Sequence, residues 1–168
     1  GALIDSFGVG EKLITASSDP VLSGVYKLVA TEENDKIIPK IKLSNTVEKT
    51  TIPGFKKLYR LYNEEGKVTG DLLSMSSEKI SDNDRIFNSD PNKTYQKRKM
   101  HGLKLEPLRV KIFEQGQLVY QQPKTMTIQK TSKEKISQLP QACLRLKNPD
   151  IYDVYWTHQL KNLREKMI

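Results

Sequence analysis

Two glycines at a spacing of two, Gly8 and Gly10, follow the apolar stretch Ala2-Leu3-Ile4 in the run Phe7-Gly8-Val9-Gly10. A glycine turn leaves its main-chain N–H groups bare, and several such groups that point into one concavity can bind phosphate, most strongly where a helix begins. Lys27 lies further along the chain and supplies a point charge of the kind that suits a phosphate. An ordinary turn and a solvated strand lysine would give the same pattern, so the residues alone leave both interpretations open.

A second group of residues that could bind anions lies between positions 93 and 104. Its cations, with no acidic residue between them, are Lys93, Lys97, Arg98, Lys99 and Lys104. Tyr95 and His101 lie among them, and cations interleaved with aromatic rings suit single-stranded nucleic acid. No recognisable nucleic-acid-binding motif surrounds the cluster, so a solvated face is the preferred interpretation.

Residue types that carry metal or nucleophilic chemistry are sparse. The chain has one cysteine, Cys143, and two histidines, His101 and His158, far apart in the sequence, so we expect no zinc site. The acidic runs at 32–36 and 81–85 lack the ligand spacing of a calcium loop, and no G-x-S-x-G motif is present. We interpret His101 as a loop residue and His158 as a first-turn helix residue, and we assign no catalytic residue.

Three β-hairpins are predicted to position these groups. The first pairs residues 25–30 with 37–43 across the polar turn 31–36. The second pairs 56–62 with 67–73, and the third pairs 108–113 with 117–120. Glycine near the end of the second and third loops suits a left-handed turn residue. In the third hairpin, apolar residues alternate with basic ones, which is the period-two pattern of a half-buried strand.

The remaining segments read as one loop and several helices. Residues 76–102 are polar and rich in turn formers, so we expect a long loop with at most one short helical turn. After Pro123 a helical face is predicted, kinked or divided at Pro140 and ended by Asn148-Pro149; its apolar members are Ile136, Leu139, Cys143 and Leu146.

A last helix is predicted to begin at Thr157 as its N-cap, with Leu160, Leu163 and Met167 on one side. We expect Trp156 to pack this helix against the hairpin sheet. Hairpins followed by helices make the predicted fold class α+β.

Bulk composition agrees with a protein that has a real core, and its positive charge suits either an anionic partner or solubility alone. The chain has 168 residues, enough for one domain, and a net charge of +8, which favours anions such as phosphorylated molecules or nucleic acid. No apolar run approaches the roughly 20 residues that cross a bilayer. A single cysteine suits a reducing, cytoplasmic setting. The chain begins at Gly1 inside an apparent strand, and we expect a C-terminal piece of a longer protein.

Several stretches resemble the nicotinate phosphoribosyltransferases. "IDSFGVGEKLITASSDPVLSGVYKLV" is similar to the last barrel strand of that family, where a GVG turn precedes a GVYKL strand. "IPKIKLSNTVEKTTIPGFKKLYRLYNEEGK" resembles the family's K-x-S-x-x-x-x-K-x-x-x-P-G-x-K region. The likeness reappears in "LEPLRVKIFEQGQLVY" and "RLKNPDIYDVYWTHQLKNLREKMI". It covers residues 3–73 and 105–168, and leaves 76–102 without a clear counterpart.

The resemblance implies an enzyme that joins nicotinate to phosphoribosyl pyrophosphate, with ATP hydrolysis, to give nicotinate mononucleotide for NAD salvage. It implies substrate- and phosphate-binding roles for Gly8, Val9, Gly10, Glu11 and Lys27, with Lys27 reaching the phosphates across a dimer. Threonine is common in the family where this chain has Glu11, whose carboxylate would repel phosphate, so only its backbone is expected to take part. The family's phosphorylated histidine and substrate-binding arginines lie upstream of position 1, so this chain alone is expected to be inactive.

The same resemblance implies a division of the chain and a set of partners. Residues 1–35 would be the end of an irregular α/β barrel of the type II phosphoribosyltransferases, with the phosphate-binding turn. Residues 36–168 would be a C-terminal lobe with hairpins, the loop 76–102 and helices over 125–168. ATP, magnesium and a homodimer are implied for the full-length enzyme, with no cofactor held by this part alone, no nucleic acid and no membrane. The alternative is a non-catalytic, basic nucleic-acid-binding or interaction module that uses residues 93–104.

Overall fold

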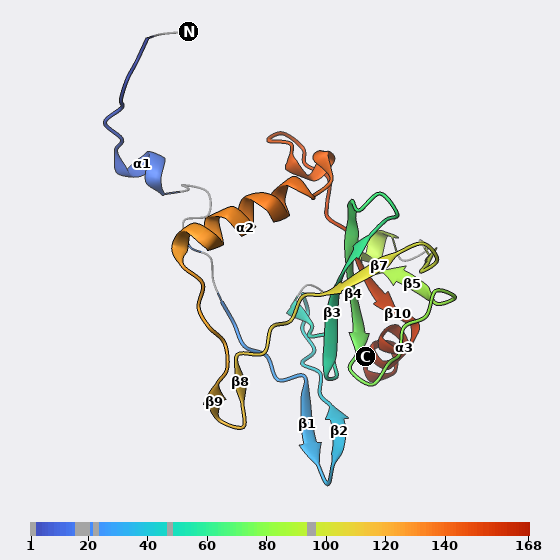
Figure 1. Cartoon of the computed structure of the whole chain (residues 1–168). Helices are drawn as coiled ribbons and strands as arrows, with labels where there is room; N and C mark the ends of the chain where they lie inside the picture. Colours follow the sequence, from blue (N-terminus) through green and yellow to red (C-terminus); the bar gives the residue numbers. More distant parts are fainter. Residues whose placement is uncertain (1–2, 16–20, 22–23, 47–48, 94–96) are drawn as a thin grey trace.

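A six-stranded mixed sheet organises the chain (Figure 1). The computed structural model describes residues 3–15, 21, 24–46, 49–93 and 97–168. The strand order is β6-β5-β10-β4-β3-β7, and only β10 and β4 run parallel. The strands are β3 (Lys56–Tyr62), β4 (Val68–Met75), β5 (Arg85–Asn88), β6 (Lys97–Lys99), β7 (Lys104–Pro107) and β10 (Val154–Thr157). With helices joined to this sheet, the α+β class is confirmed.

The second predicted hairpin forms the centre of the sheet. β3 and β4 pair antiparallel, and Gly66 has a φ of 74° in the turn between them, as predicted. Gly70 in β4 has a φ of 144°, and a Cβ there would lie 2.7 Å from the carbonyl oxygen of Asp153 and 2.9 Å from the ring of Tyr155. Only glycine therefore lets β10 approach β4 this closely.

The core lies on one face of this sheet. It consists of the buried side chains Leu61, Leu72, Ile86, Met100, Leu103 and Tyr155. Successive strand residues point to opposite faces, so Trp156 and Phe87 point to the other face. There, helix α3 (His158–Met167) packs against β4, β5 and β10.

The prediction of a long loop over 76–102 is wrong. This segment contains β5 and β6, with the one-turn 3-10 helix η2 (Pro91–Lys93) between them. Ile86 and Met100 are fully buried in the core, although few apolar residues surround them in the sequence. The short strands are stable because β10 supplies a hydrogen-bonded partner for β5. β10 itself was not predicted as a strand.

The first and third hairpins are shorter than predicted. In the first, β1 (Ala30–Glu33) and β2 (Lys36–Pro39) are joined by Asn34 and Asp35, both with positive φ, so the turn has two residues instead of six. In the third, β8 (Phe113–Glu114) and β9 (Gln117–Leu118) have two residues each and are exposed. The predicted half-buried strand 108–113 is therefore wrong, since only Phe113 of it lies in a strand and the side chains of Val110 and Ile112 are exposed.

The sequence predicts a helical region that is either kinked or divided at Pro140, and in the structure it is divided. Helix α2 (Thr125–Ser137) ends before that proline, and the 3-10 helix η3 (Gln141–Leu144) follows it. The predicted face is not a buried one, since Ile136 and Leu146 are exposed. The last helix is confirmed: Thr157 caps α3 and its Oγ1 accepts from the N–H of Leu160. Arg164 of this helix lies over the ring of Trp156, as expected of a packing residue.

The N-terminal segment extends away from the sheet (Figure 1) and contains helix α1 (Glu11–Ile14). Residues 3–10 and 24–29 form no strand, so the strand predicted over 25–30 begins only at Ala30. A strand needs hydrogen-bonded partners along its length, and in these two segments the backbone hydrogen bonds involve Gly10, at the start of α1, and Val29, whose carbonyl accepts from the N–H groups of Lys40 and Gly54. Within the described part of the chain, no helix has the length and apolar character needed to span a membrane.

Candidate functional site

The glycine segment is extended and open, not a tight turn. Gly10 is the N-cap of α1, with a φ of −84° and a ψ of 168°, and its carbonyl accepts from the N–H of Leu13. Neither Gly8 nor Gly10 has a left-handed backbone, and a Cβ added at either would meet nothing within 4 Å. Val9 and Glu11 are exposed as well. This backbone is bare, as predicted, but it does not fold into a concavity by itself.

Lys27 lies elsewhere, in an open cavity of about 720 Å³. We call this cavity the lysine pocket, because Lys27, Lys42, Lys49 and Lys56 all line it. Residues 8–11 are not among its lining residues, so the structure does not bring Lys27 and the glycine segment into one cavity. Lys42, Lys49 and Lys56 belong to the K-x-S-x-x-x-x-K-x-x-x-P-G-x-K stretch but were not predicted as site residues. The spacing of these three lysines in that stretch was the sequence signal that could have identified them as site residues.

Hydrogen bonds hold the walls of the lysine pocket together. The N–H of Lys42 donates to Oγ1 of the buried Thr51 at 2.8 Å, and the N–H of Thr51 donates back to the carbonyl of Lys42 at 3.2 Å. The Val29 carbonyl accepts from Gly54 at 2.7 Å, which ties the segment of Lys27 to the same loop. Three separate stretches are therefore fixed around one cavity.

Lys56 is bound by carbonyl oxygens. Its Nζ donates to the carbonyls of Ile52 at 2.6 Å and Gly54 at 2.7 Å. Burial lowers the pKa of the Lys56 ammonium, because removal from water disfavours the charged form. No carboxylate of a described residue pairs with any of the four lysines.

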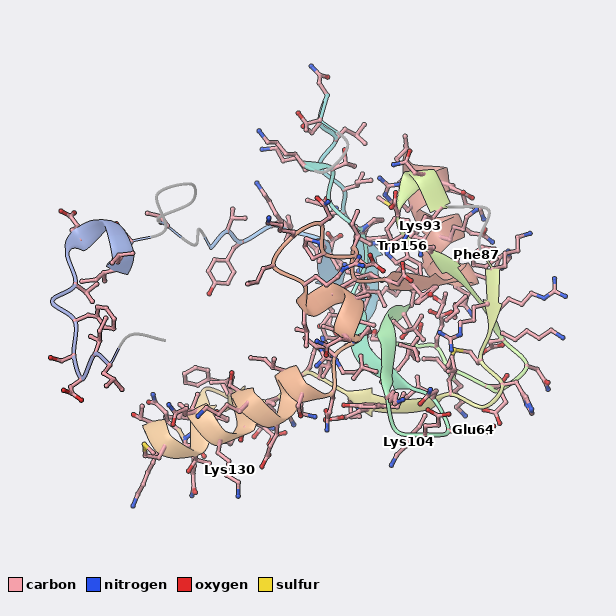
Figure 2. The ribbon with its side chains drawn as sticks, turned by 90° about the horizontal axis from the view of Figure 1, so that it is seen from above. Glu64, Phe87, Lys93, Lys104, Lys130 and Trp156 are labelled. Carbon is pink, nitrogen blue, oxygen red and sulfur yellow. The ribbon has the colours of Figure 1, made fainter. Side chains whose placement is uncertain are left out.

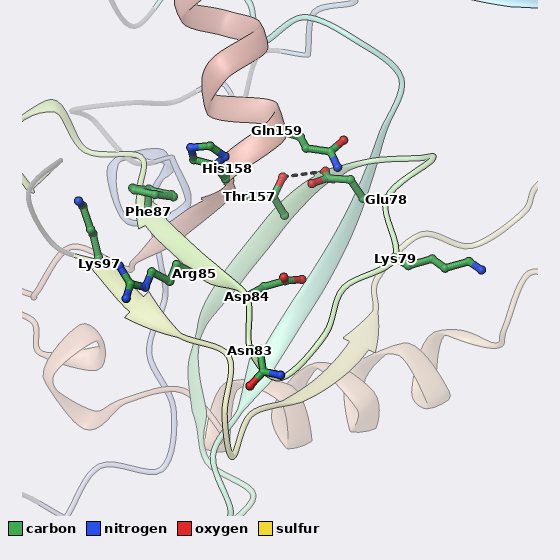
Figure 3. Close-up of a pocket in the computed structure, with 10 residues that line it drawn as sticks. All are labelled: Glu78, Lys79, Asn83, Asp84, Arg85, Phe87, Lys97, Thr157, His158 and Gln159. Atoms are coloured by element: carbon green, nitrogen blue, oxygen red, sulfur yellow. Dashed lines mark hydrogen bonds between the residues drawn. The ribbon is translucent and has the colours of Figure 1, made fainter.

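A second cavity, of about 550 Å³, lies at the start of α3 (Figure 3). Its carboxylate Glu78 accepts from Oγ1 of Thr157 at 2.7 Å and from the N–H of Met75 at 2.6 Å. His158 is in the first turn of α3, as predicted, and its ring lies 5.7 Å from that of Phe87. These contacts stabilise the start of α3. Because they already engage the carboxylate of Glu78, this group is not free to act as a general base.

The basic residues between 93 and 104 do not form one surface. Lys93 pairs with Asp153 at 3.0 Å, and Lys97 lies 5.8 Å from the centre of the Phe87 ring. Lys93 and Lys104 are well apart in Figure 2. His101 lies in the turn before β7, as predicted, and Tyr95 lies outside the described residues. Two of the described cations are thus engaged within the chain itself, by Asp153 and by the ring of Phe87.

A third polar cluster joins α2 to the sheet. Lys135 donates to Glu106 at 2.8 Å, and the hydroxyl of Tyr62 donates to the other carboxylate oxygen at 2.5 Å. The Lys135 hydrogen bond, followed by that of Tyr62, lowers the pKa of Glu106. We interpret this cluster as a structural contact between α2 and the sheet, because Lys135, Tyr62 and Glu106 already form hydrogen bonds with one another.

Comparison with known proteins gives a consistent result. A family model described as the nicotinate phosphoribosyltransferase C-terminal domain matches residues 55–164. The nicotinate phosphoribosyltransferase of Bacillus subtilis is 36% identical over 171 residues, an alignment that covers 98% of this chain and 35% of the relative. That of Dictyostelium discoideum is 33% identical, over 95% of this chain and 28% of the relative.

The fold is shared with a solved member of the same group. The crystal structure of human nicotinic acid phosphoribosyltransferase matches with a TM-score of 0.62 and 22% identity, over 79% of this chain and 26% of that chain. The chain thus spans about a third of the length of the curated relatives that it matches. Its sequence and its fold together show that it belongs to the nicotinate phosphoribosyltransferase family, as the C-terminal domain.

Proposed function

We propose that this chain is part of an enzyme that joins nicotinate to phosphoribosyl pyrophosphate, with ATP hydrolysis, and gives nicotinate mononucleotide for NAD salvage. The observation that carries the proposal is the family match across residues 55–164. Relatives that carry the name nicotinate phosphoribosyltransferase also align with almost the whole chain. The chemistry of bond making belongs to the remainder of the enzyme, and this chain supplies binding groups.

The proposed binding groups are the backbone of Gly8, Val9, Gly10 and Glu11, and the side chain of Lys27. The open backbone before α1 leaves room for a phosphorylated ribose to approach. Exposed main-chain N–H groups donate well to phosphate oxygens. Glu11 takes part through its N–H only, because its carboxylate would repel a phosphate. Lys27 contributes charge from the wall of the lysine pocket.

ATP and magnesium are proposed for the full-length enzyme. Lysine ammonium groups suit the phosphates of ATP as point charges. Within the ranges that the structure describes, no three His, Cys, Asp or Glu side chains lie close enough together to share a metal ion. We propose that this part of the enzyme holds no cofactor by itself.

The domain division, the dimer partner and the compartment of the enzyme are proposed from the same family match. Residues 1–35 would complete the irregular α/β barrel of a type II phosphoribosyltransferase, and residues 36–168 would form the closing lobe. The extended N-terminal segment, with exposed Leu3, Phe7 and Leu13, suits such a role, because those side chains need a partner surface. We further propose a homodimer with an active site at its interface, in the cytoplasm.

The experiment is a direct assay of the full-length enzyme that contains this chain. Purified protein is incubated with nicotinate, phosphoribosyl pyrophosphate, ATP and magnesium, and nicotinate mononucleotide is measured by liquid chromatography. We expect product that depends on both substrates and rises with ATP. An enzyme that makes no nicotinate mononucleotide under any of these conditions contradicts the proposal.

A further inference from the structure

The lysine pocket concentrates positive charge in one concave site. Four lysines, Lys27, Lys42, Lys49 and Lys56, are among the residues that line one cavity of about 720 Å³. No aspartate or glutamate is among its described lining residues. Like charges brought together without a counter-charge repel one another, and an anion in the cavity removes that cost.

The pocket is built in advance of any ligand. Two hydrogen bonds between the backbone of Lys42 and Thr51 close the loop that carries Lys49, and the hydroxyl of Thr50 donates to the carbonyl of Ser44 at 3.5 Å. Lys56 is held in place by three successive carbonyls, so its charge is fixed at the base of the loop. Groups fixed in advance lose less entropy on binding, which favours affinity.

The number and type of groups favour a chain of phosphates over a single one. A diphosphate carries roughly three negative charges near neutral pH and has oxygens on both phosphorus atoms, so it can contact lysines from several walls at once. The cavity also has apolar surface from Val25, Val29 and Leu43, which suits the sugar of a small phosphorylated molecule. A nucleic-acid strand needs a long groove, whereas this site is a single cavity.

We propose that the lysine pocket binds the diphosphate group of a small phosphorylated ligand, with Lys42 and Lys49 as direct ligands to its oxygens. Lys56 acts chiefly as a positioning residue, because its ammonium is engaged by the loop carbonyls. The assignment rests on the proposed function for the identity of the natural ligand, a phosphoribosyl diphosphate or a nucleotide. Its chemistry can be tested with inorganic pyrophosphate alone.

The test is isothermal titration calorimetry of inorganic pyrophosphate into the full-length enzyme at low ionic strength, with orthophosphate and a thymidine oligonucleotide as competing probes. The variants are Lys42→Met and Lys49→Met, which alter exposed side chains and so leave the fold intact. Lys130→Met is the matched control, since that side chain is 80% exposed on α2 (Figure 2). Thermal unfolding of each variant checks that it is folded.

We expect pyrophosphate to bind more tightly than orthophosphate, and each pocket variant to weaken it about ten- to one-hundred-fold, as for the loss of one charged hydrogen bond. Lys130→Met should bind like the parent protein. Pyrophosphate affinity that is equal in all four proteins overturns the inference, as does tighter binding of the oligonucleotide at this pocket. An enzyme that makes no nicotinate mononucleotide but binds pyrophosphate through Lys42 and Lys49 contradicts the proposed function and supports the pocket.

Discussion

Replacement of Ile86 by alanine is the sharpest test of the fold, because this side chain lies in a segment whose sequence reads as a loop. Ile86 is fully buried in β5 and belongs to the core cluster. Truncation of a buried isoleucine to alanine removes its transfer free energy and leaves a cavity, which together cost about 2–5 kcal/mol. We expect a loss of about 3 kcal/mol in the free energy of unfolding. The melting temperature should fall by about 6–12 °C, given about 2–4 °C for each kcal/mol at this chain length.

The matched control is Ile136→Ala on α2, where the same side chain is 49% exposed. It should change the free energy of unfolding by less than about 0.5 kcal/mol. Both variants are measured by urea denaturation followed by circular dichroism, in the same buffer as the parent protein. Equal losses for Ile86→Ala and Ile136→Ala would refute the assignment of residues 85–88 to the core.

Three further predictions follow from other parts of the structure. Gly70→Ala should unfold well below the parent in a thermal melt, because its Cβ would meet the carbonyl of Asp153 at 2.7 Å; an unchanged melting temperature would contradict this packing. The pKa of Glu106 is lowered by Lys135, so their contact stabilises the fold above the unfolded pKa of about 4.3 and is lost as pH falls through the lower folded value. The difference in unfolding free energy between the parent and Lys135→Met should be at most about 1 kcal/mol at pH 7 and vanish at low pH; a difference that grows on acidification would reverse the sign of this argument. The 168-residue chain alone should make no nicotinate mononucleotide in the assay above, and turnover by this chain would show that it carries catalytic groups.

Local signals in the sequence predict the parts of the fold that depend on local chemistry. The β3–β4 hairpin was predicted correctly because Gly66 closes its turn, and α3 because Thr157 caps its first turn. Pro140 marked the end of α2, because a proline cannot continue a helix. Each of these features is decided within about four residues.

Contacts between distant residues decide the parts that the sequence did not predict. β5 and β10 are four residues each, and they are strands because they pair with one another across about 70 positions, with Trp156 opposite Phe87. The lysine pocket also depends on contacts between residues far apart in the sequence. The family resemblance predicts Lys27 as a site residue. That Lys27 and Lys42 line the same cavity depends on the hydrogen bond that joins the segment around Val29 to the loop at Gly54.

The glycine segment offers the most direct test of substrate binding by this chain. Within this chain a side chain at Gly10 meets no neighbour within 4 Å and needs no left-handed backbone, so Gly10→Val should leave the melting temperature of the 168-residue chain unchanged. The melting temperature of the full-length variant is measured as well, so that an effect on packing against the rest of the enzyme is told apart from an effect on ligand binding. The measurement is the Michaelis constant of the full-length enzyme for phosphoribosyl pyrophosphate, with that for nicotinate as the internal control. We predict that Gly10→Val raises the first by about tenfold, the equivalent of one lost hydrogen bond to a charged group, and leaves the second unchanged. Identical constants for the variant and the parent would contradict the role of this backbone in binding phosphate.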